Sequence, residues 1–241
     1  MEILYRIYQG IFMVPMTVIL TIITALSTAI GSMLGGGKWW GYYPAHYWSK
    51  LMCWITFVRV TVVGRENIDK NTSYVFVANH QGAYDIFVVY GFLGHSFRWM
   101  MKKKLKKIPF VGFACDKGGH IFVDNSSPAA VKKTMDAAHQ RLQKGLSLVV
   151  FPEGSRSWNG KMNKFKKGAY QLAVQCNLPV VPITIDGAFE VMPRFKKLPV
   201  WGHIKLTIHK PILAPEGGHD ISNLMEETYE VIHSALPEKD K

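Results

Sequence analysis

Two residues in the stretch NHQGAYDIF (79–87) have side chains that could move a proton. His80 and Asp85 are five positions apart, which turns them about 140° from each other on a helix and puts them on opposite faces of a strand. They can meet only if the chain turns between them, and Gly82 makes such a turn easy. An aspartate bonded to one imidazole nitrogen would fix the tautomer and leave the other nitrogen as a general base. The alternative is a helix-capping aspartate beside a histidine that packs.

The sequence offers this base no obvious nucleophile of its own. There is no G-x-S-x-G elbow, and Ser155 lies in a different turn, EGSRS. The substrate is therefore expected to bring the hydroxyl that His80 activates. No cluster of ligating residues has metal-site spacing, and GGGKWW lacks the pattern of a P-loop, so we expect neither a metal nor a cofactor.

A second polar turn, FPEGSRS (151–157), has the composition of an anion site. Gly154 permits close backbone approach, and the planar fork of Arg156 suits a phosphate monoester. Turn amides can hold the remaining phosphate oxygens. The alternative is a surface turn in which Arg156 pairs with Glu153.

The formal net charge of +12 predicts an anionic partner. Lysines gather in KKKLKKIPFVG (102–112), and further basic patches are KMNKFKK (161–167) and RFKK (194–197). No nucleic-acid-binding signature accompanies them, so anionic lipid headgroups are favoured over nucleic acid. Most of these lysines are expected to form a solvated face.

The first part of the chain predicts attachment to a membrane. From Ile7 to Gly37 no residue is charged, which is long enough for a helix to cross the hydrocarbon core. Six aromatic residues within 39–48 resemble an interfacial belt, and the apolar stretch 51–58 is too short to span. One spanning helix plus an interfacial helix, or a hairpin in one leaflet, both fit. A cleaved signal peptide and a buried soluble helix fit less well.

Residues 1–57 are accordingly expected to be an anchor, and residues 58–241 one α/β domain with a mainly parallel sheet. Short runs rich in β-branched and aromatic residues predict strands, and the segments between them predict helices. The strands are expected at 58–64, 74–79, 121–125, 146–151, 178–185 and 204–209, and the helices at 127–145, 165–176 and 221–236.

Polar clusters follow three of these strands directly: His80, the turn at 151–154, and Asp124 with Asn125. In open α/β sheets, ligands bind outside the carboxyl ends of the strands. The clusters are therefore expected to converge on one site. The three widely spaced cysteines predict buried apolar side chains in a reducing compartment, without a disulfide framework.

Taken together, these motifs resemble the glycerolipid acyltransferases of the bacterial lysophosphatidic acid acyltransferase type. NHQGAYD is similar to that family's first motif, NH-x4-D, and KKKLKKIPFVG to its second. FPEGSRS is similar to the third motif and VVPITIDG (180–187) to the fourth. The order and spacing match, and the likeness covers roughly residues 58–210.

The resemblance implies direct acyl transfer from an acyl carrier protein or coenzyme A thioester to the sn-2 hydroxyl of lysophosphatidic acid, forming phosphatidic acid in phospholipid biosynthesis. His80 would be the general base, oriented by Asp85. Acceptor binding would fall to the motif residues Lys103, Glu153, Gly154, Ser155 and Arg156. The hydrophobic N-terminus is similar to that of members on the inner membrane, so the resemblance implies a catalytic domain on its cytoplasmic side.

Two positions depart from the family pattern. Asn125 stands where the second motif commonly ends in an arginine, and Lys104 where an acidic residue is common. A phosphate-free lyso-aminolipid acceptor is therefore an alternative to lysophosphatidate. A non-catalytic basic protein that binds membranes is a further alternative from another class.

Overall fold

The chain builds one seven-stranded sheet in the order β1-β7-β6-β2-β5-β3-β4. The computed structural model describes residues 2–214 and 220–240. Residue 1 of the predicted anchor (1–57) and residues 215–219 and 241 of the predicted α/β domain (58–241) lie outside the described ranges. Strands β2 to β6 run parallel to one another, and β7 reverses against β6, with β1 parallel to β7. The strands are β1 (Val58–Val63), β2 (Val75–Ala78), β3 (Phe97–Lys102), β4 (Ile121–Val123), β5 (Ser147–Val150), β6 (Val180–Asp186) and β7 (Gly202–Ile208). The predicted mainly parallel sheet is confirmed.

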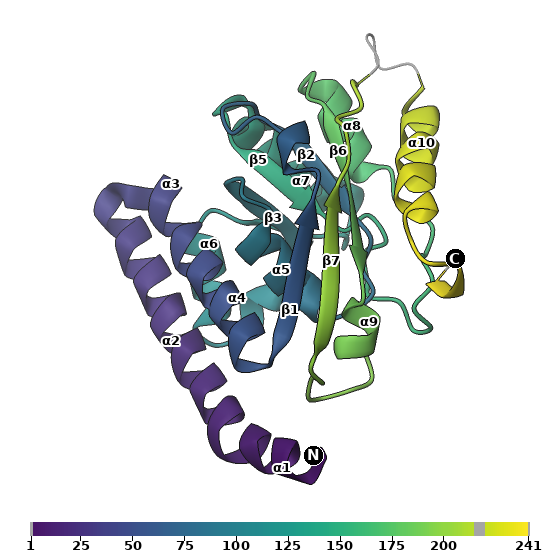
Figure 1. The fold of residues 1–241 in the computed structure, drawn as a ribbon. Coiled ribbons are helices and arrows are strands. Elements are labelled where there is room, and N and C mark those ends of the chain that lie inside the picture. The colour runs from purple at the N-terminus through teal and green to yellow at the C-terminus, as the bar shows by residue number, and fades with distance from the viewer. Residues whose placement is uncertain (1, 215–219, 241) are drawn as a thin grey trace.

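Helices cover both faces of this sheet, which makes three layers (Figure 1). On one face lie α4 (Tyr43–Ile55) and α5 (Tyr84–Phe92), and on the other α7 (Pro128–Gln143), α8 (Gly168–Gln175) and α10 (Ile221–Ser234). The short helices α6 (Val111–Lys117) and α9 (Ala188–Val191) follow β3 and β6. The central strands β2 and β5 are buried on both sides, as their near-continuous apolar sequences require.

The six predicted strands and three predicted helices are present, with ends shifted by a few residues. Ser127 caps α7 as expected, because its hydroxyl accepts from the Ala130 amide at 3.2 Å. Strand β3 was not predicted. Its sequence, FRWMMK, contains Arg98, which is only 2% exposed and satisfies its guanidinium with carbonyls of Phe97, Gly37 and Lys38. Such distant partners are invisible to a local reading of the sequence.

The N-terminal apolar segment forms one helical path, Glu2–Trp40, through α1 (Glu2–Tyr8), α2 (Val14–Gly31) and α3 (Gly37–Trp40). Among the described residues it is the helix whose length and composition would allow it to cross a membrane. The predicted glycine break is a kink, where Gly35 has a φ of 98°. One side of α2 packs on α4 and α6, whereas its other side exposes large apolar side chains: Val18, Ile19, Ile23, Leu26 and Ile30.

The aromatic segment 39–48 is divided between surface and core. Trp39 and Tyr47 are exposed, as an interfacial belt requires, but Tyr42 is buried edge-on against Phe97 of β3. Helix α4, which carries most of this segment, packs closely against α5. The segment therefore joins the apolar N-terminus to the element that begins at the candidate site.

Candidate active site

His80 and Asp85 are in contact because the chain turns directly after β2. Nδ1 of His80 donates to Oδ2 of Asp85 at 2.7 Å, and the same oxygen accepts from the amides of Gln81 at 2.8 Å and Gly82 at 2.9 Å. Asp85 is fully buried in the first turn of α5, while the His80 side chain keeps 13% of its surface exposed. Since Nδ1 carries the proton, Nε2 is left with a free lone pair, and His80 lines the cavity described below.

Gly82 is needed in this turn for space rather than for an unusual φ. A Cβ atom at this position would overlap the carbonyl of Ala188, the first residue of α9, and Gly82 also forms a β-bridge to Pro193. Its backbone is not in the left-handed region. The glycine thus lets the turn after β2 lie against the turn after β6, and this packing sets the position of His80.

Glu153 holds the two polar turns together from inside. Its Oε1 accepts from the His80 amide at 2.6 Å, and its Oε2 accepts from the amide and the side-chain Nδ2 of Asn163 at 2.9 and 2.8 Å. Burial raises the pKa of the Glu153 carboxyl, and these three N–H donors oppose that rise. With 5% exposure and both oxygens occupied, Glu153 positions His80 and is not available to pair with Arg156.

A row of aromatic rings leads from His80 into the protein. The His80 ring stacks on Phe151 with centroids 4.0 Å apart, and Phe151 stacks on Trp99 at 5.1 Å. Beyond Trp99 lie Tyr90 and the buried His120. Stacking and the bond to Asp85 together leave the imidazole of His80 little freedom to rotate.

His120 has its protonation state set by its neighbours. Nδ1 accepts from the Trp99 amide at 3.0 Å, so Nε2 carries the proton that it shares with the Tyr90 hydroxyl at 2.8 Å. Burial, together with the nearby Arg98 and Arg141, lowers the pKa of His120 to about 3. His120 is therefore neutral at physiological pH. Its two hydrogen bonds connect the start of β4 to β3 and to α5.

A cavity of about 770 Å³ opens at His80 and runs beneath α2. Its inner wall is mostly apolar and includes Trp99 and Met100 of β3, Ala25 of α2 and Val111 of α6. A mostly apolar cavity of this size, with His80 in its lining, suits a hydrocarbon chain.

The mouth of this cavity is basic. Its lining includes five cationic side chains from separate parts of the chain: Lys102, Lys104, Arg156, Lys166 and Arg194. Within the described ranges none of the five forms an ion pair with a carboxylate. Burial and the like charges around it lower the pKa of Lys102. A cluster of cations without acids is an arrangement that an anionic group of a ligand would stabilise.

Most of the residues predicted from the sequence converge here. His80, Gly154, Ser155 and Arg156 line the cavity, with Asp85 and Glu153 directly behind His80. Lys103 does not line it. Its side chain is 63% exposed, and Nζ donates to Oδ2 of Asp124 at 2.5 Å. Its neighbours Lys102, the last residue of β3, and Lys104 line the cavity instead. The sequence could not indicate this, because consecutive lysines look alike until the backbone path is known.

Comparison with known proteins shows which family this chain belongs to. The family model described as Acyltransferase matches residues 59–186, just over half of the chain. The chain belongs to the acyltransferase family. The matched range contains both the His80–Asp85 pair and the turn at 151–157, so the site lies within the part that the family shares.

Individual acyltransferases agree with this assignment. The chloroplastic 1-acyl-sn-glycerol-3-phosphate acyltransferase of Arabidopsis thaliana is 34% identical over 172 residues, covering 69% of this chain and 48% of that protein. An uncharacterized acyltransferase of Schizosaccharomyces pombe is 30% identical, covering 76% of this chain and 67% of that protein. The chain therefore spans about half the length of the plant relatives that it matches.

A solved acyltransferase structure extends the likeness to nearly the whole chain. The crystal structure of the 1-acyl-sn-glycerophosphate (LPA) acyltransferase PlsC from Thermotoga maritima superposes with a TM-score of 0.80 at 26% identity. The match covers 96% of this chain and 93% of that chain, so it includes the N-terminal helices as well as the sheet.

Proposed function

We propose that this acyltransferase moves a fatty acyl group from a thioester to the sn-2 hydroxyl of lysophosphatidic acid, making phosphatidic acid. The observation that carries the proposal is the free Nε2 of His80, oriented by Asp85, at the junction of an apolar channel and a cationic mouth. In the part of the chain that the structure describes, no serine or cysteine side chain is hydrogen-bonded to His80. A base of this kind acts on a hydroxyl that the substrate supplies.

In the proposed reaction, Nε2 of His80 takes the proton of the acceptor hydroxyl as its oxygen attacks the thioester carbonyl carbon. The tetrahedral intermediate then collapses, the C–S bond breaks, and the imidazolium returns the proton to the departing thiolate sulfur. Asp85 stays ionised and stabilises the imidazolium. The products are an ester and a free thiol, and no acyl-enzyme forms.

The phosphate of the acceptor would be held by Arg156, with Lys102, Lys166 and Arg194 nearby. The fork of Arg156 can bind two phosphate oxygens at once, and no carboxylate competes for it. Asn125 also lines the cavity, at the position where the family's second motif commonly ends in an arginine. It is the observation that favours a second candidate, a phosphate-free lyso-aminolipid acceptor.

The apolar channel would take the acyl chain of the thioester, and the acyl carrier protein or coenzyme A would remain outside. The helix Glu2–Trp40 would bring the site to its amphiphilic substrates by associating with a membrane. Because α2 packs on α4 and α6 with one side and exposes apolar side chains on the other, an arrangement within one leaflet is favoured over an isolated spanning helix. We place the catalytic domain on the cytoplasmic side of the inner membrane.

The test is release of free thiol from acyl-carrier-protein and acyl-coenzyme A thioesters in detergent, with lysophosphatidate or a phosphate-free lysolipid as acceptor. Release that requires lysophosphatidate supports the proposal and identifies the donor. Release that requires the phosphate-free acceptor would replace the first candidate with the second. No release from either donor with either acceptor would refute both and leave a basic protein that binds membranes.

A further inference from the structure

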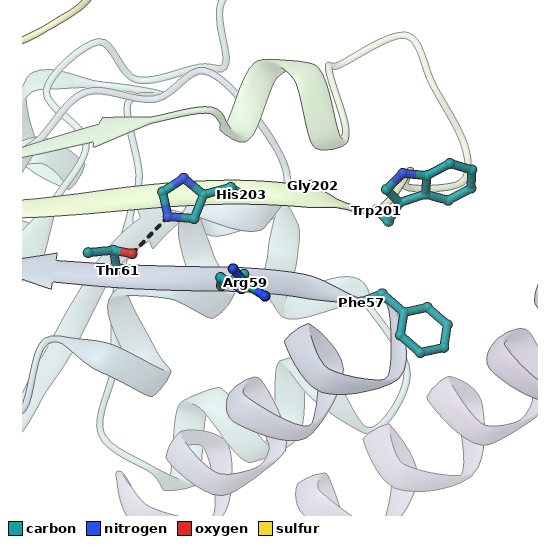
Figure 2. Close-up of a pocket in the computed structure, with 6 residues that line it drawn as sticks. All are labelled: Phe57, Arg59, Thr61, Trp201, Gly202 and His203. Atoms are coloured by element: carbon teal, nitrogen blue, oxygen red, sulfur yellow. Dashed lines mark hydrogen bonds between the residues drawn. The ribbon is translucent and has the colours of Figure 1, made fainter.

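An open groove lies on the outer face of the sheet, where β1 and β7 begin (Figure 2). Its volume is about 530 Å³, and the residues that line it come from the starts of these two strands: Phe57, Arg59, Thr61, Trp201, Gly202 and His203. None of them lines the cavity at His80. The groove is therefore separate from the candidate active site.

The floor of the groove carries two basic side chains, Arg59 and His203, side by side. Arg59 of β1 and His203 of β7 are direct partners in the strand register, and both side chains are exposed. His203 is hydrogen-bonded through Nε2 to the Thr61 hydroxyl at 2.8 Å, as Figure 2 shows. Arg59 carries a permanent positive charge, and its planar fork suits an anion. An anion bound by Arg59 would lie next to His203 as well.

No acidic side chain provides that anion within the ranges that the structure describes. Arg59 and His203 form no ion pair, and the groove lining contains no carboxylate. Asp186 lies opposite Lys205 in the β6–β7 register, one step along the outward face from His203. Asp186 therefore lies opposite a cation other than Arg59 and His203.

The walls of the groove are aromatic and continue into the apolar N-terminal helix. Phe57 directly precedes β1 and Trp201 directly precedes β7, and both side chains are exposed. Trp201 contacts Tyr5 of α1 edge-on at 4.7 Å, and Phe57 contacts Tyr8 at 5.5 Å. The remaining side of α1 exposes the apolar side chains of Ile3, Leu4 and Ile7.

The groove also faces the same edge of the sheet as His80. Because β1 and β7 run opposite to β2, their first residues lie at the edge where β2 ends. In Figure 1, α1 and the loop between α9 and β7 lie together at the lower edge of the sheet. A membrane that receives α1 would therefore touch Trp201, Phe57 and the groove together.

We propose that this groove binds the phosphate of an anionic membrane phospholipid that is not the reacting lipid. Arg59 supplies a fork for two phosphate oxygens, while His203 and Thr61 complete the polar floor. Trp201 and Phe57 sit at the level of the headgroups, which is where aromatic side chains are favoured in membranes. The bound lipid fixes the edge of the sheet against the membrane, with the cavity mouth beside it.

The experiment is co-sedimentation of the full-length protein with neutral phosphatidylcholine vesicles and with vesicles containing about 30 mol % phosphatidylglycerol. The variants are Arg59→Gln, Arg59→Lys and the double variant Arg59→Gln/His203→Gln. Lys197→Gln is the matched control, because Lys197 is exposed in the same loop as Trp201 but outside the groove. Thermal unfolding verifies that each variant is folded.

We expect Arg59→Gln to weaken binding to the anionic vesicles at least about tenfold, with Arg59→Lys recovering only part of it, because lysine cannot bind two oxygens at once. Lys197→Gln should cost about fivefold or less, the effect of one diffuse surface charge. Equal losses for Arg59→Gln and Lys197→Gln, or full recovery with Arg59→Lys, would overturn the proposal. Thiol release by the same preparations in detergent tests the reaction separately, so anion-dependent binding without turnover would refute the reaction and leave this site standing.

Discussion

Replacing Asp85 with asparagine tests the negative charge beside the base with almost no change in shape. Oδ2 of Asp85 accepts three N–H bonds, from His80 Nδ1 and from the amides of Gln81 and Gly82. An asparagine has one accepting oxygen and one NH2 group that can only donate. With the asparagine oxygen in the place of Oδ2, all three N–H bonds and the tautomer of His80 are kept. The NH2 group then takes the place of Oδ1, which is buried without a hydrogen-bond partner among the described residues, and the substitution removes the negative charge beside His80.

The expected cost follows from the loss of that charge. The carboxylate of Asp85 stabilises the imidazolium that forms when His80 takes the proton, and a neutral amide stabilises it less. A hydrogen bond to a charged group contributes about 1.5–3 kcal/mol, equivalent to roughly 10- to 100-fold in rate. We expect a loss of about 10- to 100-fold in kcat here, with little change in KM.

The assay is initial-rate thiol release in detergent across a range of acceptor concentrations, with thermal unfolding measured on the same samples. Asp136→Asn is the matched control, because Asp136 is an exposed carboxylate on α7. It should remain within about twofold of the wild type. A folded Asp85→Asn protein whose kcat stays within about twofold of the wild type would refute the idea that the charge of Asp85 stabilises the His80 imidazolium.

Three further predictions concern the residues around this pair. Arg156→Gln should raise KM for lysophosphatidate by about 10- to 100-fold and leave KM for a phosphate-free acceptor nearly unchanged; equal effects on both acceptors would contradict a phosphate contact. Glu153→Gln should lower both Tm and kcat, because one accepting carboxylate oxygen that holds His80 or Asn163 becomes a donor; an unchanged Tm in scanning calorimetry would contradict this role. The His120 pKa of about 3 lies below its ordinary 6.5, so the unfolded state alone takes up a proton as pH falls below 6.5, and stability declines by up to about 1.4 kcal/mol per pH unit down to pH 3. The loss of Tm between pH 7.5 and 5.5 should therefore be smaller in a folded His120→Gln protein, and an equal loss would contradict the assignment.

Much of the fold could be predicted because its signals are local. Strands β2, β5 and β6 are short runs of β-branched and aromatic residues, and α7 has a capping serine followed by proline. Strand β3 escaped because a buried arginine interrupts its apolar pattern, and that arginine is satisfied by carbonyls some 60 residues earlier in the chain. Long-range satisfaction of a polar group leaves no periodic signal.

In the candidate site too, local features could be predicted from the sequence and long-range contacts could not. The meeting of His80 with Asp85, and its position after a strand, could be predicted from spacing and chemistry. The positioning contacts of Glu153 with the His80 amide and Asn163 could not, because they join turns from different strands. His120 carries no motif, and its role appears only through the buried bonds to Trp99 and Tyr90.

The central claim is that His80 removes the proton of the acceptor hydroxyl, and His80→Ala tests it most directly. The measurement is the rate of thiol release with lysophosphatidate in detergent, beside the wild type and His233→Ala, a histidine on α10 at the opposite face of the sheet. We predict that His80→Ala lowers turnover by about 10²- to 10⁴-fold while remaining folded, and that His233→Ala stays close to the wild type. A folded His80→Ala protein with near-normal turnover would contradict the account.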